Sequence, residues 1–185
     1  GLDMATGVLR ATGNDDLAGH ISAARGGLTA LESGENPVDA GANILMGVGG
    51  AVARSNGAAD LADTIDVASN IVESGSPQRA LSFARNAAED EGIVGTAAGD
   101  FIEGRIGDFE NGNISMNELM LDTTAVISQV REPDQTEVQN IMRRDLSGAS
   151  EEDVRNLVIE AINSAESTAN NQTFSQIADQ IRGVS

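Results

Sequence analysis

The chain has 185 residues, of which 29 are acidic and 11 are basic, and its formal net charge is −18. It contains no cysteine, tryptophan, tyrosine or lysine, so every basic residue is an arginine. This length allows a domain with a sizeable core. The composition excludes disulfides, thiolate catalysis and cysteine-based metal sites, and it disfavours nucleic-acid binding, which requires a basic stripe with stacking aromatics.

Apolar residues recur at three- and four-residue spacing through the first half of the chain, which predicts four helices. The helices are predicted over about 14–34, 36–57, 58–75 and 76–92; all four end near a glycine, and all but the third begin at a capping residue, followed by proline in two of them. Their predicted apolar faces comprise Leu17, Ile21, Ala24, Leu28, Leu31, Val38, Leu45, Val48, Val52, Leu61, Ile65, Ala68, Val72, Leu81 and Ala84.

Two of the helical segments are rich in glycine. Residues 92–107 contain five glycines, and residues 41–50 contain four. Each glycine costs about 1 kcal/mol relative to alanine inside a helix. We therefore expect both segments to be tightly packed and rather buried, either held by their neighbours or close to another backbone that the small residues let approach.

Stronger helix signals follow Ser115. A capping box pairs Ser115 with Glu118, and Pro133 ends that helix. Further helices are predicted over about 134–146 and from Ser150, and a polar loop over 167–173 precedes a last short helix. That last helix carries Phe174, Ile177 and Ile181.

No segment alternates with period two, so no significant sheet is expected. The sequence thus predicts an all-α fold, a bundle or extended array of roughly seven to nine helices. The composition shifts near Gly112, which suggests a Gly/Ala-rich region over 1–111 and an amphipathic region over 112–185, or one continuous domain.

The stretch from Asp108 to Leu119 matches the second half of an EF-hand calcium loop, with Gly112 at the sixth position and Glu118 at the twelfth. The first half does not match, because Gly107 and Phe109 stand where carboxylates are required. We interpret the stretch as a helix connection closed by the capping box.

Other candidate sites are weaker still. His20 is the only histidine, and we expect it at the surface or partly buried in a structural role. The acidic clusters at 87–92 and 150–153 could be paired catalytic carboxylates, but solvated helix ends explain them better. Arg143 and Arg144, the only adjacent basic pair, are interpreted as a solvated helix face. No catalytic, cofactor-binding or metal-binding residue and no cofactor is predicted.

The longest apolar run, residues 40–53, is shorter than the roughly 20 residues that a bilayer requires, so no transmembrane span is expected. The first residue is Gly1, which is expected of a processed product, a fragment or a chain with a tag remnant.

An acidic, lysine-free, Ala/Gly-rich chain resembles proteins of extreme halophiles, haloarchaea and their viruses in particular. Molar salt screens the repulsion among its carboxylates. An acidic protein from a high-GC mesophile is the alternative. We expect a non-enzymatic structural or assembly protein that binds protein partners or itself, most concretely a capsid-associated or tail protein of a haloarchaeal virus, located in the virion or a halophile cytoplasm. A helical binding or regulatory module and a membrane-active protein are the other hypotheses.

Overall fold

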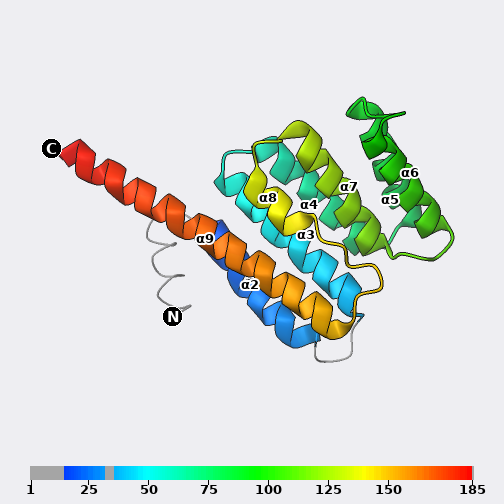
Figure 1. Cartoon of the computed structure of the whole chain (residues 1–185), viewed down its shortest axis with the longest axis horizontal. Coiled ribbons are helices and arrows are strands. Elements are labelled where there is room, and N and C mark those ends of the chain that lie inside the picture. Colours follow the sequence, from blue (N-terminus) through cyan, green and yellow to red (C-terminus); the bar gives the residue numbers. More distant parts are fainter. Residues whose placement is uncertain (1–14, 32–35, 185) are drawn as a thin grey trace.

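The computed structural model of the chain describes residues 15–31 and 36–184. Within these residues it contains eight helices and no strand, which confirms the predicted all-α array (Figure 1). The helices are α2 (Asp15–Leu31), α3 (Pro37–Ser55), α4 (Ala59–Ser74), α5 (Pro77–Asp90), α6 (Ala97–Glu110), α7 (Met116–Arg131), α8 (Thr136–Met142) and α9 (Glu151–Val184).

Helix α3 forms the centre of the bundle and contacts α2, α4, α7, α8 and α9. Ten of its 19 residues are buried. Its glycines allow this close packing: a Cβ atom on Gly41 would lie 2.5 Å from Val154 Cγ1, and one on Gly49 would lie 2.7 Å from Met142 Sδ. The prediction of a tightly packed segment is confirmed for α3, and the neighbours at these two glycines are helices of the same chain.

The predicted helix boundaries in the described part of the N-terminal half are largely confirmed. The Asn36 side chain accepts a hydrogen bond from the Val38 amide at 3.1 Å, and Ser76 accepts one from the Arg79 amide at 3.3 Å. Glycines with positive φ follow α3, α4 and α5 as predicted: Gly57, Gly75 and Gly92. The predicted cap Asn14 and stop Gly34 lie outside the described residues.

Helix α6 departs from the prediction of a buried segment. Gly92 and Gly95 adopt φ of 67° and 84°, so the chain turns there, and the helix begins only after Thr96. Phe101 is 44% exposed, although its spacing had placed it on the buried face. The prediction was wrong for this segment because α6 packs one face against α5 and α7 and leaves the other face to solvent.

Helices α8 and α9 also differ from the prediction. Helix α8 ends at Met142, four residues early, because the backbone leaves helical conformation at Arg143, with ψ of 69°. The predicted loop over 167–173 is instead part of α9, which runs for 34 residues. That stretch contains neither glycine nor proline, so its polar side chains do not interrupt the helix.

The core joins both halves of the sequence. Helix α3 belongs to the Gly/Ala-rich region and packs against α7, α8 and α9 of the amphipathic region. Buried alanine, isoleucine, leucine, valine and methionine fill this core, while Phe83 and Phe109 are only partly buried against it. The division into regions 1–111 and 112–185, or one continuous domain, stays a prediction.

Candidate functional site

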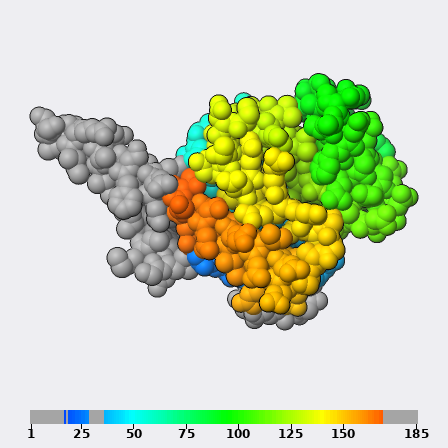
Figure 2. Space-filling view, viewed as in Figure 1, coloured from blue at the N-terminus to red at the C-terminus, as the bar shows by residue number. Residues whose placement is uncertain are grey.

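A groove of about 790 Å³ lies between α6, α7 and the residues that follow α8. On the molecular surface, α6 stands beside α7 and the segment after α8 (Figure 2). The groove has an apolar lining of Ala98, Phe101, Ala125, Val126, Val130 and Met142. Its charged residues are Arg105, Asp122, Arg143, Arg144 and Asp145. We call it the arginine groove, because three of the eleven arginines of the chain line it.

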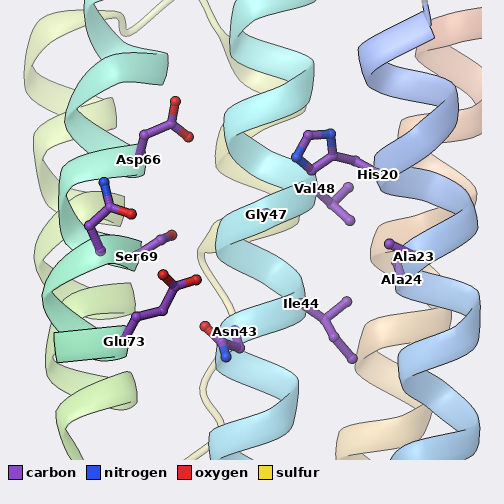
Figure 3. Close-up of a pocket in the computed structure, with 11 residues that line it drawn as sticks. His20, Ala23, Ala24, Asn43, Ile44, Gly47, Val48, Asp66, Ser69 and Glu73 are labelled. Carbon is purple, nitrogen blue, oxygen red and sulfur yellow. The ribbon is translucent and has the colours of Figure 1, made fainter. Parts of the chain in front are cut away.

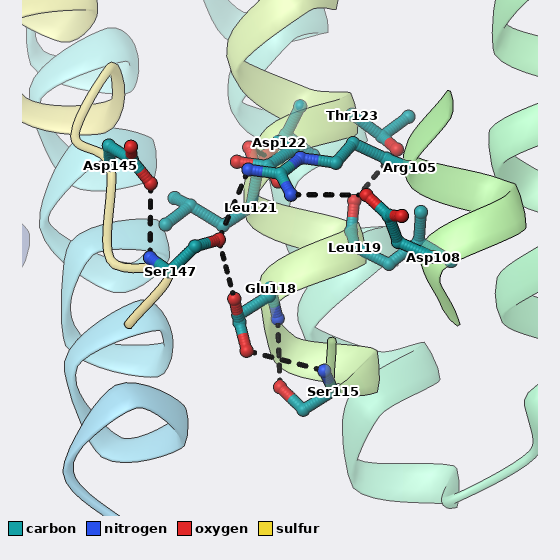
Figure 4. Close-up of polar contacts among 11 residues, drawn as sticks. Arg105, Asp108, Ser115, Glu118, Leu119, Leu121, Asp122, Thr123, Asp145 and Ser147 are labelled. Atoms are coloured by element: carbon teal, nitrogen blue, oxygen red, sulfur yellow. Dashed lines mark hydrogen bonds and ion pairs between the residues drawn. The ribbon is translucent and has the colours of Figure 1, made fainter. Parts of the chain in front are cut away.

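Arg105 links the helices on the two sides of the groove. Its Nε lies 2.9 Å from Asp122 Oδ2 on α7, and the two side chains are 19% and 18% exposed. The guanidinium also donates to Asp108 Oδ2 at 3.4 Å and to Ser147 Oγ at 3.2 Å (Figure 4). The ion pair with Asp122 therefore fixes α6 against α7, and the hydrogen bond to Ser147 fixes α6 against the turn after α8.

Burial raises the pKa of Asp122 from 3.8 to about 6. The Arg105 guanidinium opposes this increase, whereas the carboxylates of Glu118 and Asp145 add to it. A half-buried carboxyl of this kind changes its charge near neutral pH. The groove thus contains one group whose ionisation alters the local balance between arginines and carboxylates.

The residues of the calcium-loop candidate hold this site together. The Ser115 hydroxyl accepts from the Glu118 amide at 3.2 Å, and Glu118 Oε1 accepts from the Ser115 amide at 3.3 Å, which is the predicted capping box. The second oxygen of Glu118 accepts from Ser147 Oγ at 3.2 Å. Asp108 is engaged by Arg105. Among the described residues, no group of three or more histidines and carboxylates is arranged to hold a metal ion.

The remaining arginines differ in how they are used. Arg144 Nη1 lies 2.7 Å from Glu160 Oε2, and its side chain is only 15% exposed. Arg143 is exposed, and its side chain has no hydrogen-bond or ion-pair partner among the described residues. The interpretation of both as a solvated helix face was wrong, since α8 ends before them.

Exposed apolar surface lies beside these charges. Phe101 and Val130 are 44% and 38% exposed, and the Arg105 Cζ atom lies 5.5 Å from the centroid of the Phe101 ring. The same groove is lined by Arg143, which has no partner among the described residues, and apolar contact area together with such a guanidinium suits recognition of an anionic group that also carries an apolar side chain.

His20 lines a second groove, of about 570 Å³, between α2, α3 and α4. It is exposed on α2 and faces Asp66, Ser69 and Glu73 of α4 across α3 (Figure 3). Asp66 Oδ2 already lies 2.7 Å from Arg54 Nη2. The histidine therefore occupies the surface position that was expected.

The two acidic clusters lie at helix ends, as expected. Glu91 caps the C-terminus of α5 and pairs with Arg131 Nε at 2.5 Å. The Ser150 hydroxyl accepts from the Asp153 amide at 3.2 Å in the first turn of α9.

Sequence reasoning missed the arginine groove. Arg105 and Asp122 are 17 positions apart and carry no motif, so only the packing of α6 on α7 brings them together. The exposure of Phe101 could not be predicted, because its helical spacing fits a buried face as well as an exposed one.

Comparisons with known protein families, with curated proteins and with solved structures find no match for the chain. Within the described residues, no helix has both the length and the apolar character that crossing a membrane demands.

Proposed function

We propose that this chain is a non-enzymatic assembly protein that works at high salt, most concretely a capsid-associated or tail component of a haloarchaeal virus particle. The observation that carries the proposal is the shape of α9. Its N-terminal part packs on α2, α3 and α8, and its C-terminal part extends away from the other helices (Figure 1).

A projecting helix needs a partner for stability. With 34 residues, α9 is about 50 Å long at 1.5 Å per residue. In proteins most of the stability of a helix comes from packing one of its faces rather than from intrinsic propensity. None of the other described helices lies beside this end of α9 in Figure 1, and packing against another molecule would supply that stability.

The charges support high salt as the working solvent. Carboxylates outnumber arginines 29 to 11, and even paired ones remain at the surface: Asp63 and Asp66 are 69% and 59% exposed while they contact Arg54. In dilute buffer such a surface repels both itself and other copies. At molar salt the Debye length falls to about 3 Å, so copies can approach.

Two Gly-rich apolar segments, over 43–53 and 92–99, motivate the membrane-active alternative. The first lies in α3, at the centre of the bundle, whereas the second includes Val94, which is 60% exposed. Insertion of the first segment into a bilayer would require the other helices to separate.

Light scattering combined with far-UV circular dichroism, from about 0.1 M to about 3 M NaCl, tests the proposal. We expect helical chains that form large assemblies as the salt rises, with no change on adding calcium. The variant Asn171→Pro should keep the thermal midpoint of the bundle and lose assembly, because proline interrupts α9, whereas Asn171→Ala should assemble. A monomer at every salt concentration would favour a binding or regulatory module instead.

A further inference from the structure

The exposed large apolar side chains lie in two places on the described surface, three of them in or near the arginine groove and one on α4. Phe101 and Val130 line the arginine groove, and Val94, 60% exposed, precedes its lining residue Ala97 by three positions. The fourth such side chain, Val67, lies on α4 and is 47% exposed. No residue of α4 lines the arginine groove, so the two places are separate surfaces of one chain.

The surface around Val67 is acidic. Asp60 and Asp63 precede it by seven and four positions, so all three residues share one face of α4, and all three are exposed. We call this face the α4 ridge. Asp63 Oδ1 lies 3.3 Å from Arg54 Nη2, and Asp66 contacts the same guanidinium, so this one arginine pairs with two carboxylates.

We propose that the arginine groove receives the α4 ridge of a second copy of this chain. Val67 would contact Phe101 and Val130, and the carboxylates of the ridge would meet Arg143. Arg143 is the anchor because Arg105 and Arg144 already have carboxylate partners within their own chain. The match is one of charge as well as apolarity, since the groove lining holds three arginines against the carboxylates of Asp122 and Asp145, whereas the ridge is acidic.

The contact is heterologous, because ridge and groove are different surfaces. After one such contact forms, one copy keeps a free ridge and the other keeps a free groove, so assembly continues into a ring or an open chain. High salt is compatible with this contact: it screens the long-range repulsion between copies, whereas partly buried pairs are screened much less. The inference rests on the proposed assembly function and names one surface pair that would carry it.

Charge reversal tests the contact at about 3 M NaCl by light scattering. Arg143→Glu and Asp63→Arg should each weaken self-association by at least about tenfold, because like charges then oppose each other. A mixture of the two variants should assemble again, because the native ridge of Arg143→Glu meets the native groove of Asp63→Arg, and the altered groove of the first and the altered ridge of the second also carry opposite charges. Arg79→Glu is the matched control, since Arg79 is exposed on α5 and lies outside both surfaces.

Disulfide trapping provides a second measurement, because the chain has no cysteine of its own. Under oxidation, a mixture of Val67→Cys and Phe101→Cys chains should form a mixed disulfide dimer in excess over either homodimer. Replacing Phe101→Cys by Ser82→Cys, at an exposed position on α5, should abolish that excess.

The outcomes separate this inference from the proposed function. If the wild-type chain assembles and Arg143→Glu assembles equally well, the groove contact is wrong and the assembly function stands. If the wild-type chain never assembles, both fail. Saturable binding of octanoate that Arg143→Glu abolishes, without any change in assembly, would instead assign the groove to small apolar carboxylates and overturn the contact.

Discussion

Gly99 offers a sharp test of the packing of α6. A Cβ atom at this position would lie 2.2 Å from the carbonyl oxygen of Ile93. That oxygen cannot move away freely, because it accepts hydrogen bonds from the Thr96 amide at 3.0 Å and the Thr96 hydroxyl at 2.6 Å. Gly99 itself donates to Thr96 Oγ1 at 3.3 Å, so the whole N-terminal cap of α6 would have to shift.

Gly104 is the matched control, because it lies inside the same helix and an added Cβ would meet nothing within 4 Å. Gly104→Ala should raise the free energy of unfolding by about 0.5–1 kcal/mol through helix propensity. Gly99→Ala gains no more than this from helix propensity and loses about 1–3 kcal/mol of unfolding free energy through overpacking. The two variants should therefore differ by roughly 1–3 kcal/mol.

For a chain of this length, 1 kcal/mol corresponds to about 2–4 °C in the thermal midpoint. Thermal unfolding followed by circular dichroism at constant high salt would measure the difference. A Gly99→Ala variant at least as stable as Gly104→Ala would refute the reasoning, because it would mean that the turn over 92–96 does not press against α6.

Three further predictions concern stability. The pKa of Asp122 is about 6 in the folded chain, against its ordinary value of 3.8. The folded state therefore binds the proton of this carboxyl more tightly than the unfolded state does. Proton binding contributes at most about 3 kcal/mol to the free energy of unfolding; this contribution is complete below about pH 4 and is lost as the pH rises through 6. Urea unfolding from pH 4 to 7 should therefore show a smaller decline for Asp122→Asn than for the wild type or for Asp134→Asn, and equal declines would contradict the assignment. Ser115→Ala should lower the unfolding free energy by about 1 kcal/mol through loss of the cap of α7, whereas Ser82→Ala, exposed within α5, should not. Gly41→Ala should destabilise more than Gly49→Ala, because its Cβ meets the stiff Val154 side chain, whereas that of Gly49 meets the flexible Met142; the reverse order in thermal midpoints would show that the α3–α9 contact relaxes easily.

The sequence revealed helices and their ends wherever a local chemical signal marks them. Asn36 before Pro37, Ser76 before Pro77 and the Ser115–Glu118 box each act within three residues, so a single chain shows them directly. Helix α9 was cut short in the prediction because polar composition alone was taken as a loop signal, although no glycine or proline occurs at 167–173. The burial of the segment over 92–107 was overestimated because its glycines have different roles. Gly95 turns the chain before α6, Gly99 allows a close contact, and Gly104 does neither.

The arginine groove could not be predicted from the sequence, because its residues come from three segments that only packing brings together. It differs from the rest of the surface in how its arginines are paired. Several arginines of the described chain join different structural segments: Arg25 of α2 pairs with Glu166 of α9, Arg105 of α6 with Asp122 of α7, and Arg144, just after α8, with Glu160 of α9. In a chain with so few cations, each such pair both fixes two helices and removes one positive charge from the surface. Arg143 follows Met142 at the end of α8 and lies in the groove, and its side chain has no such partner in the part of the chain that the structure describes. Its guanidinium is therefore available to a carboxylate of another molecule, next to apolar surface that the bundle leaves exposed.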